Sequence, residues 1–186
     1  MKNTKVMLGA LAVLATLALA TTAVAAVVIK GTNRDDVLTG TERNDLIVGK
    51  KGNDTINGLA GNDRIHGNQD NDTIDAGAGN DRAWGGYGND ALAGGEGNDV
   101  LRGRPGNDSL DGGPGNDRMW PGRGADTQNG GDGDDVLHAL ARDNQIDQID
   151  CGPGNDVVWL NAKETSDVHV NCETVKTVSR DDGSDS

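Results

Sequence analysis

From Gly49 to Trp120 the chain reads GKKGNDTIN GLAGNDRIH GNQDNDTID AGAGNDRAW GGYGNDALA GGEGNDVLR GRPGNDSLD GGPGNDRMW, which is eight nonapeptides in unbroken register. The same phase extends outward from Gly31 to His138 and gives twelve repeats without an insertion or deletion. A further copy, CGPGNDVVW, begins at Cys151 after a shift of phase. A flexible glycine-rich linker has no reason to keep an aliphatic residue at every ninth place, so this period argues for a folded repeat and against low-complexity disorder.

Each repeat combines turn residues with a short apolar segment. Positions one and four are mostly glycine, and position five is mostly asparagine, residues that tolerate the left-handed backbone of tight turns. Positions seven to nine fit a short strand, in which side chains alternate so that the apolar position eight faces inward. Two nonapeptides then form one coil of 18 residues, and the coils stack as two parallel sheets, six coils making a body about 30 Å long. The expected core is aliphatic and consists of Ile56, Ile65, Ile74, Leu92, Leu101 and Leu110.

The sixth position is aspartate in all twelve repeats, and stacked coils would place these carboxylates in two rows. Asp54, for example, is expected beside Asp72. Carboxylates so close together repel one another unless a cation lies between them, and Ca²⁺ accepts six to eight oxygens from carboxylates and backbone carbonyls, whereas Mg²⁺ fits less well. Several calcium ions are therefore predicted, with metal binding driving the folding. The candidate ligands are Asp36, Asp45, Asp54, Asp63, Asp72, Asp81, Asp90, Asp99, Asp108, Asp117, Asp126 and Asp135.

Composition narrows the functional classes. The 186 residues carry a net charge of −13, with 34% hydrophobic and 2% aromatic residues, which is too little bulky apolar material for an ordinary globular core. The negative charge disfavours nucleic acid as a partner. Ser109 and the histidines at 66, 138 and 169 form no nucleophile pattern, so no catalytic activity is expected. Position three carries no threonine row, which argues against an ice-binding array.

These nonapeptides resemble the hemolysin-type calcium-binding repeat, or RTX repeat, of pattern G-G-x-G-x-D-x-U-x, in which U is a large aliphatic residue. The resemblance implies an all-β fold, a right-handed parallel β-roll (a β-helix solenoid), with calcium in the turns. It carries the ligand role over to the twelve aspartates and also to Asp156 in the copy after the phase shift. Weak or absent sites are expected in the first two repeats, which have Arg34 and Arg43 where glycine belongs, and in the eleventh, PGRGADTQN. Hemolytic activity is not expected to follow from the family name.

The first 25 residues have the pattern of a secretory signal peptide. Lys2 and Lys5 precede an apolar stretch from Met7 to Ala20, and Ala23-Val24-Ala25 fits a cleavage site. Cleavage would leave a secreted, extracellular protein with no membrane span in the mature chain. The roll is then expected over residues 26–138.

Residues 139–178 resemble the closing segment that follows such repeats in some secreted bacterial proteins, and a stack of coils needs a cap at its open edge. An even cysteine count in an exported chain favours a disulfide between Cys151 and Cys172, which would staple this cap. A zinc site would need more ligands than His169 supplies. Residues 179–186 are expected to form a disordered tail.

The two sheets are expected to differ on their outer faces. Sorting position nine by alternate repeats places His66, Trp84, Arg102, Trp120 and His138 on one sheet, whereas the other receives small polar residues. One hypothesis is that Trp84, Arg102 and Trp120 bind an extracellular partner, either an anionic glycan or a cell surface, and so serve adhesion. The alternative is that these side chains only cover the sheet.

Overall fold

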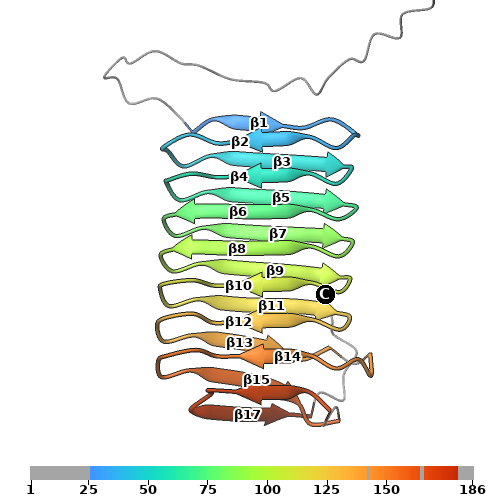
Figure 1. Cartoon of the computed structure of the whole chain (residues 1–186), viewed down its shortest axis with the longest axis vertical. Coiled ribbons are helices and arrows are strands. Elements are labelled where there is room, and N and C mark those ends of the chain that lie inside the picture. The colour runs from blue at the N-terminus through green and yellow to red at the C-terminus, as the bar shows by residue number, and fades with distance from the viewer. Residues whose placement is uncertain (1–25, 142, 164–165, 180–186) are drawn as a thin grey trace, which may run out of the picture.

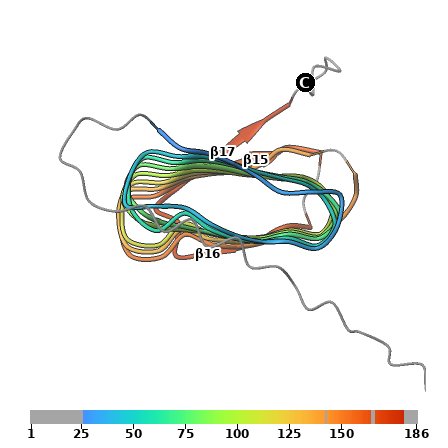
Figure 2. The same ribbon diagram turned by 90° about the horizontal axis from the view of Figure 1, so that it is seen from above.

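The computed structural model describes residues 26–141, 143–163 and 166–179, and these form a solenoid of parallel strands stacked rung upon rung (Figure 1). Seen along the stack, the chain traces a flattened oval with two long walls (Figure 2). The predicted all-β roll is confirmed. Within the described ranges, no helix is long and apolar enough to cross a membrane.

Alternate strands form the two walls. The nine-stranded sheet contains, in order, β1 (Val28–Lys30), β3 (Leu46–Lys51), β5 (Arg64–Gln69), β7 (Arg82–Tyr87), β9 (Val100–Pro105), β11 (Arg118–Arg123), β13 (Val136–Ala139), β15 (Val157–Asn161) and β17 (Thr174–Val178). The eight-stranded sheet contains β2 (Val37–Thr39), β4 (Thr55–Asn57), β6 (Thr73–Ala78), β8 (Ala91–Glu96), β10 (Ser109–Asp111), β12 (Thr127–Asn129), β14 (Gln148–Asp150) and β16 (Val168–Val170).

The register of the sheets confirms the coil of 18 residues. Ile56 lies beside Ile74 in the eight-stranded sheet, and Ile47 lies beside Ile65 in the nine-stranded sheet. Several strands are longer than the predicted triplet: β5 and β8, for instance, run for six residues and include the first three positions of the next repeat. They extend because position one also faces the interior, as the buried Ala76 shows, and so the alternation of side chains continues past position nine.

The core is a thin file of position-eight side chains between the walls. All six predicted core residues, Ile56, Ile65, Ile74, Leu92, Leu101 and Leu110, are at most 2% exposed. The one polar residue at this position, Gln128, is also buried, and its Nε2 donates a hydrogen bond to the carbonyl of His138. Such a narrow core leaves the turns at either end of the oval as the main additional source of stability.

The segment predicted to close the roll continues both walls. Strand β14 adds a rung between β12 and β16 that the nonapeptide pattern had not revealed, and β15 and β17 complete the nine-stranded sheet. Cys151 and Cys172 form the predicted disulfide, with a Cα–Cα distance of 5.2 Å. The solenoid thus continues into a segment where the sequence no longer has a regular nonapeptide period.

Candidate calcium-binding turns

The position-six aspartates stand directly above one another at the two ends of the oval. The backbone N–H of Asp72 donates to Oδ1 of Asp90 at 2.8 Å, and the N–H of Asp90 donates to Oδ1 of Asp108 at 2.9 Å. The first row runs through Asp36, Asp54, Asp72, Asp90, Asp108, Asp126, Asp147 and Asp167. The second runs through Asp45, Asp63, Asp81, Asp99, Asp117, Asp135, Asp156 and Glu173. Each row is thus a continuous ladder of carboxylates and amides.

The second carboxylate oxygen, Oδ2, is buried without a hydrogen-bond partner in most members of both rows. A buried carboxylate oxygen in that condition is costly unless a cation or a proton compensates for it. The oxygen lies against position one of its own repeat: a Cβ atom added to Gly85 would come within 2.2 Å of Oδ2 of Asp90. The atoms concerned are Oδ2 of Asp54, Asp63, Asp72, Asp81, Asp90, Asp99, Asp108, Asp117, Asp126, Asp135 and Asp156.

Burial makes the charged form of these carboxyls unfavourable. Desolvation by burial, together with the neighbouring carboxylates Asp126 and Asp90 of its row, raises the pKa of Asp108 to about 8. The same causes raise the pKa of Asp72 and of Asp117 to about 7. In each case the backbone N–H of the preceding member lowers the pKa but does not offset burial. At neutral pH the rows therefore favour bound protons or bound cations over bare buried carboxylates.

Glycine allows the turns to approach closely enough to bring backbone carbonyls together. Gly115, at position four, has a φ of 148°, and a Cβ atom there would lie 1.7 Å from the carbonyl oxygen of Gly97 one rung away. Among the described residues, no three His, Cys, Asp or Glu side chains gather into a metal cluster. The donors that the turns bring together are carbonyl oxygens beside the carboxylates of the rows. An all-oxygen donor set of this kind fits Ca²⁺ and does not fit a soft metal.

Position five has a different role from the one predicted. Its asparagines were expected to tolerate left-handed backbone, but the described positive-φ residues do not include them. Instead, the N–H of Asn107 donates to Oδ1 of Asn89 at 2.8 Å, and the N–H of Asn89 donates to Oδ1 of Asn71 at 2.7 Å. This ladder points toward the N-terminus, opposite to the aspartate ladder, and it satisfies amides of the exposed turns.

The ends of the rows differ from the middle. In the first two repeats, Oδ2 of Asp36 accepts hydrogen bonds from Thr32, and Oδ2 of Asp45 accepts them from Thr41. The chain itself thus supplies partners at the two positions where weak sites were expected. Asp126 of the eleventh repeat, by contrast, resembles the central members, because its Oδ2 is buried without a partner.

Three acidic members of the rows escaped the sequence interpretation. They are Asp147, which is 4% exposed and whose pKa burial raises to about 7, Asp167, and Glu173. A short motif could have revealed Asp147: the acid is followed two residues later by an apolar residue that faces the core, as in Asp147-Gln148-Ile149. It was hidden because insertions around it break the nine-residue period.

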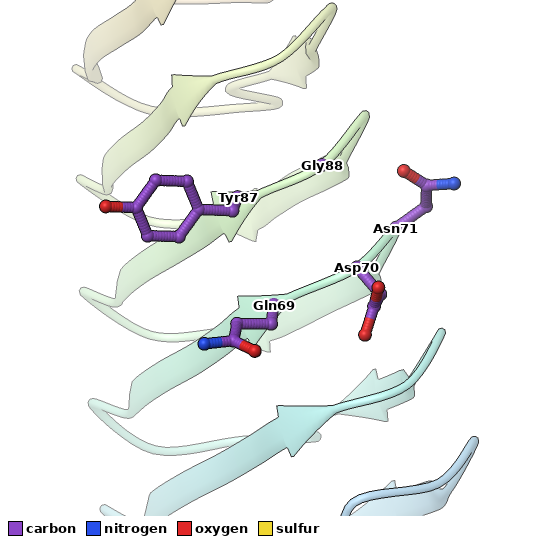
Figure 3. A pocket seen from close by; sticks show the side chains of 5 residues that line it. All are labelled: Gln69, Asp70, Asn71, Tyr87 and Gly88. Carbon is purple, nitrogen blue, oxygen red and sulfur yellow. The ribbon is translucent and has the colours of Figure 1, made fainter.

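A shallow hollow of about 420 Å³ lies beside one turn and is lined by Gln69, Asp70, Asn71, Tyr87 and Gly88 (Figure 3). Asp70 occupies position four, where most repeats have glycine, with a φ of 72°, and its Oδ2 accepts a hydrogen bond from the N–H of Gly52. It is the one carboxylate in the lining. The hollow therefore lacks the set of ligands that a separate metal site requires.

The strip predicted to meet a partner lies on the outer face of the nine-stranded sheet. Its aromatic rings are stacked along the solenoid: Trp84 lies on His66 with ring centroids 4.4 Å apart, and the Arg102 guanidinium lies 4.9 Å from the centre of the Trp120 ring. Trp120 also stacks on His138, at 4.6 Å. The residues of the strip thus contact their neighbours on adjacent strands.

Comparison with known families agrees with this geometry. The family model described as the RTX calcium-binding nonapeptide repeat (4 copies) matches residues 30–65, 39–74, 66–101, 93–128 and 129–162. A search of the curated proteins found no match to the chain.

Proposed function

The chain belongs to the RTX calcium-binding nonapeptide repeat family, and from this premise we propose that it is a secreted structural protein whose roll folds when Ca²⁺ binds between successive turns. The observation that carries the proposal is the double row of buried Oδ2 atoms that lack partners in the protein. Bound calcium supplies the positive charge that lets these carboxyls stay ionised inside the fold.

The residues proposed to hold the ions are the central aspartates and the glycine-rich turns. The aspartates offer Oδ2, while their Oδ1 atoms keep the preceding rung in register by accepting the backbone N–H of its row aspartate. Position-one glycines leave room beside Oδ2, and position-four glycines permit the close approach of carbonyls. No residue is assigned a catalytic role. Secretion is supported by the signal-like pattern of residues 1–25, which lie outside the described residues.

Secretion would also explain why folding should depend on calcium. Sites with dissociation constants of about 10⁻⁴ to 10⁻³ M would stay empty at cytosolic calcium concentrations and fill outside the cell. The chain would then remain open during export and fold after it. A second proposed role is extracellular adhesion, in which the roll presents the outer face of its nine-stranded sheet to a partner. That role is favoured by the cationic and aromatic character of this face.

Far-UV circular dichroism during a calcium titration tests the proposal. We expect little β-signal in metal-free buffer at neutral pH, a cooperative gain with calcium, and a much weaker response to magnesium. A β-rich spectrum that is indifferent to calcium at neutral pH would contradict the proposal.

A variant pair locates the effect in the turns. Asp90→Asn removes one buried negative charge from the first row, and it should raise the calcium concentration at the folding midpoint by at least about tenfold, because even the loss of a hydrogen-bond partner of a metal ligand costs about tenfold in metal affinity. Asp75→Asn makes the same change at an exposed position of β6 and should leave the midpoint within about twofold. Equal shifts in the two variants would mean that overall charge, and not ligation, governs folding.

A further inference from the structure

Charge is divided strictly between the two walls of the roll. The strands of the eight-stranded sheet contain four acidic residues and no lysine or arginine: Asp75, Glu96, Asp111 and Asp150. The strands of the nine-stranded sheet contain ten basic residues and no aspartate or glutamate: Lys30, Lys50, Lys51, Arg64, Arg82, Arg102, Arg104, Arg118, Arg123 and Lys176. A chain whose net charge is −13 therefore has one face that attracts anions.

This cationic face is hollowed in its C-terminal half. A groove of about 870 Å³ spans the outer side of the nine-stranded sheet from β7 to β17. Its charged lining is entirely basic and consists of Arg102, Arg104 and Arg123, all three of them exposed. Trp120 and Trp159 also line it. The groove thus combines three guanidinium groups with aromatic walls and contains no carboxylate that would repel an anion.

The two tryptophan rings in the groove are covered on both faces, which limits what can stack on them. Trp120 on β11 is covered by Arg102 from β9 on one side and by His138 from β13 on the other. Trp159 lies between His138, with centroids 6.2 Å apart, and Lys176, 4.7 Å from its ring centre. Nucleobases bind such surfaces by stacking on free ring faces, and these rings have both faces occupied. We therefore base the contact with an anionic partner on guanidinium groups and not on exposed faces of Trp120.

A guanidinium stacked on a ring still presents its N–H edges. The Arg102 guanidinium lies over the Trp120 ring, and its fork of N–H donors has a geometry that matches a carboxylate or sulfate. Stacking also restricts the side chain, so less entropy is lost when an anion binds. Arg104 lies on the same strand, β9, and Arg123 lies on the neighbouring β11, so three guanidinium groups line the groove along the stack.

We propose that this groove binds an acidic polysaccharide, whose carboxylate or sulfate groups accept hydrogen bonds from Arg102, Arg104 and Arg123. The proposal deepens the adhesion role given above and rests on it. A polysaccharide with one anionic group per sugar is favoured over nucleic acid, because the acidic remainder of the roll repels a dense row of phosphates and both faces of Trp120 and of Trp159 are occupied.

Binding of a short polygalacturonate oligomer to the calcium-folded protein tests the proposal, with the fluorescence of Trp120 and Trp159 and isothermal titration as readouts. We expect saturable binding that weakens with added salt, and none to neutral dextran. A sulfated dextran oligomer in a second arm shows whether the groove prefers carboxylate or sulfate. Absence of binding in both anionic arms, or tighter binding of a single-stranded oligonucleotide, would overturn the proposal.

Two double variants decide whether the groove is the site. Arg104→Gln with Arg123→Gln should weaken binding at least about tenfold, the loss expected when one charge-assisted hydrogen bond is removed. Arg34→Gln with Arg43→Gln removes the same charge from exposed turns and should change affinity less than about twofold. Equal effects would place the contact elsewhere, for example at calcium in the turns. Circular dichroism of each variant separates loss of binding from loss of folding. If the roll folds without calcium, the folding proposal is refuted, and binding to the groove can still be tested in metal-free buffer.

Discussion

The central rungs from Gly49 to Trp120 and the C-terminal segment 139–178 build the same two sheets but hold them together differently. In the centre, every hydrogen bond between row aspartates joins residues 18 apart, as from Asp72 to Asp90. Toward the C-terminus the spacing becomes 21, then 20 and 17, and Glu173 replaces an aspartate. A disulfide between Cys151 and Cys172 crosses the same region.

The difference shows which feature the solenoid preserves. Turn length, glycine content and even the identity of the acid change between the two regions, yet each rung still places a carboxylate under the amide of the rung before it. The centre accumulates buried carboxylates, for which we propose that cations compensate, whereas the C-terminal rungs also have a covalent link. Conditions that act on charge should therefore affect mainly the centre, and reduction should affect mainly the end.

The largest expected effect is that of pH on the metal-free roll. Because burial raises the pKa of Asp72 and Asp108 from 3.8 to about 7 and about 8, the folded chain binds more protons than the unfolded chain between these limits. The stability of the metal-free roll is therefore greatest below about pH 4 and falls as pH rises toward 8. Circular dichroism in metal-free buffer should show β-structure lost over this range.

Excess calcium should reverse that dependence, since protons then compete with the metal for the same oxygens. The matched titration in calcium is the control. If the metal-free roll became more stable as pH rose, the buried carboxylates could not be the groups that limit its folding.

A smaller effect is expected from breaking the disulfide. Replacing both Cys151 and Cys172 by serine should lower the free energy of unfolding in calcium by about 3 kcal/mol, because the bond closes a loop with a sequence separation of 21. Urea denaturation measures the total, and hydrogen exchange should show the loss of protection concentrated in β14 to β17. Reduction of the unmodified protein should reproduce the result, whereas a comparable loss of protection in β5 to β8 would mean that the two regions are held together in the same way.

The smallest effect is expected in the asparagine ladder. Asn89→Ala removes the acceptor for the N–H of Asn107 and should cost about 1 kcal/mol of unfolding free energy, the usual contribution of one hydrogen bond. Asn155→Ala, in the C-terminal copy, removes an exposed Nδ2 donor to Asp134 and should cost about half as much. Urea denaturation in calcium compares the two variants. A larger loss of unfolding free energy for Asn155→Ala than for Asn89→Ala would show that the ladder contributes little in the centre.

The sequence was sufficient to predict the coil, the core and the rows because each depends on a repeated contact. An aliphatic residue such as Ile65 must recur every ninth place to fill a narrow interior, and Asp63 must recur for the rows to form. Asp147 was missed because recognition rested on period, whereas the fold requires only that its carboxylate reach the previous rung. The stacking of Trp120 between Arg102 and His138 depends on rotamers that spacing alone does not determine.

Each strand pairs with the strand two repeats earlier, so successive repeats belong alternately to the two sheets. Duplicating or deleting two nonapeptides would lengthen or shorten the stack by one rung and leave both outer faces intact. Gaining or losing a single nonapeptide would transfer every downstream side chain to the opposite wall, so that Trp120 and Arg123 would join the acidic side. The smallest unit by which such a gene can grow without mixing its two surfaces is therefore a pair of repeats.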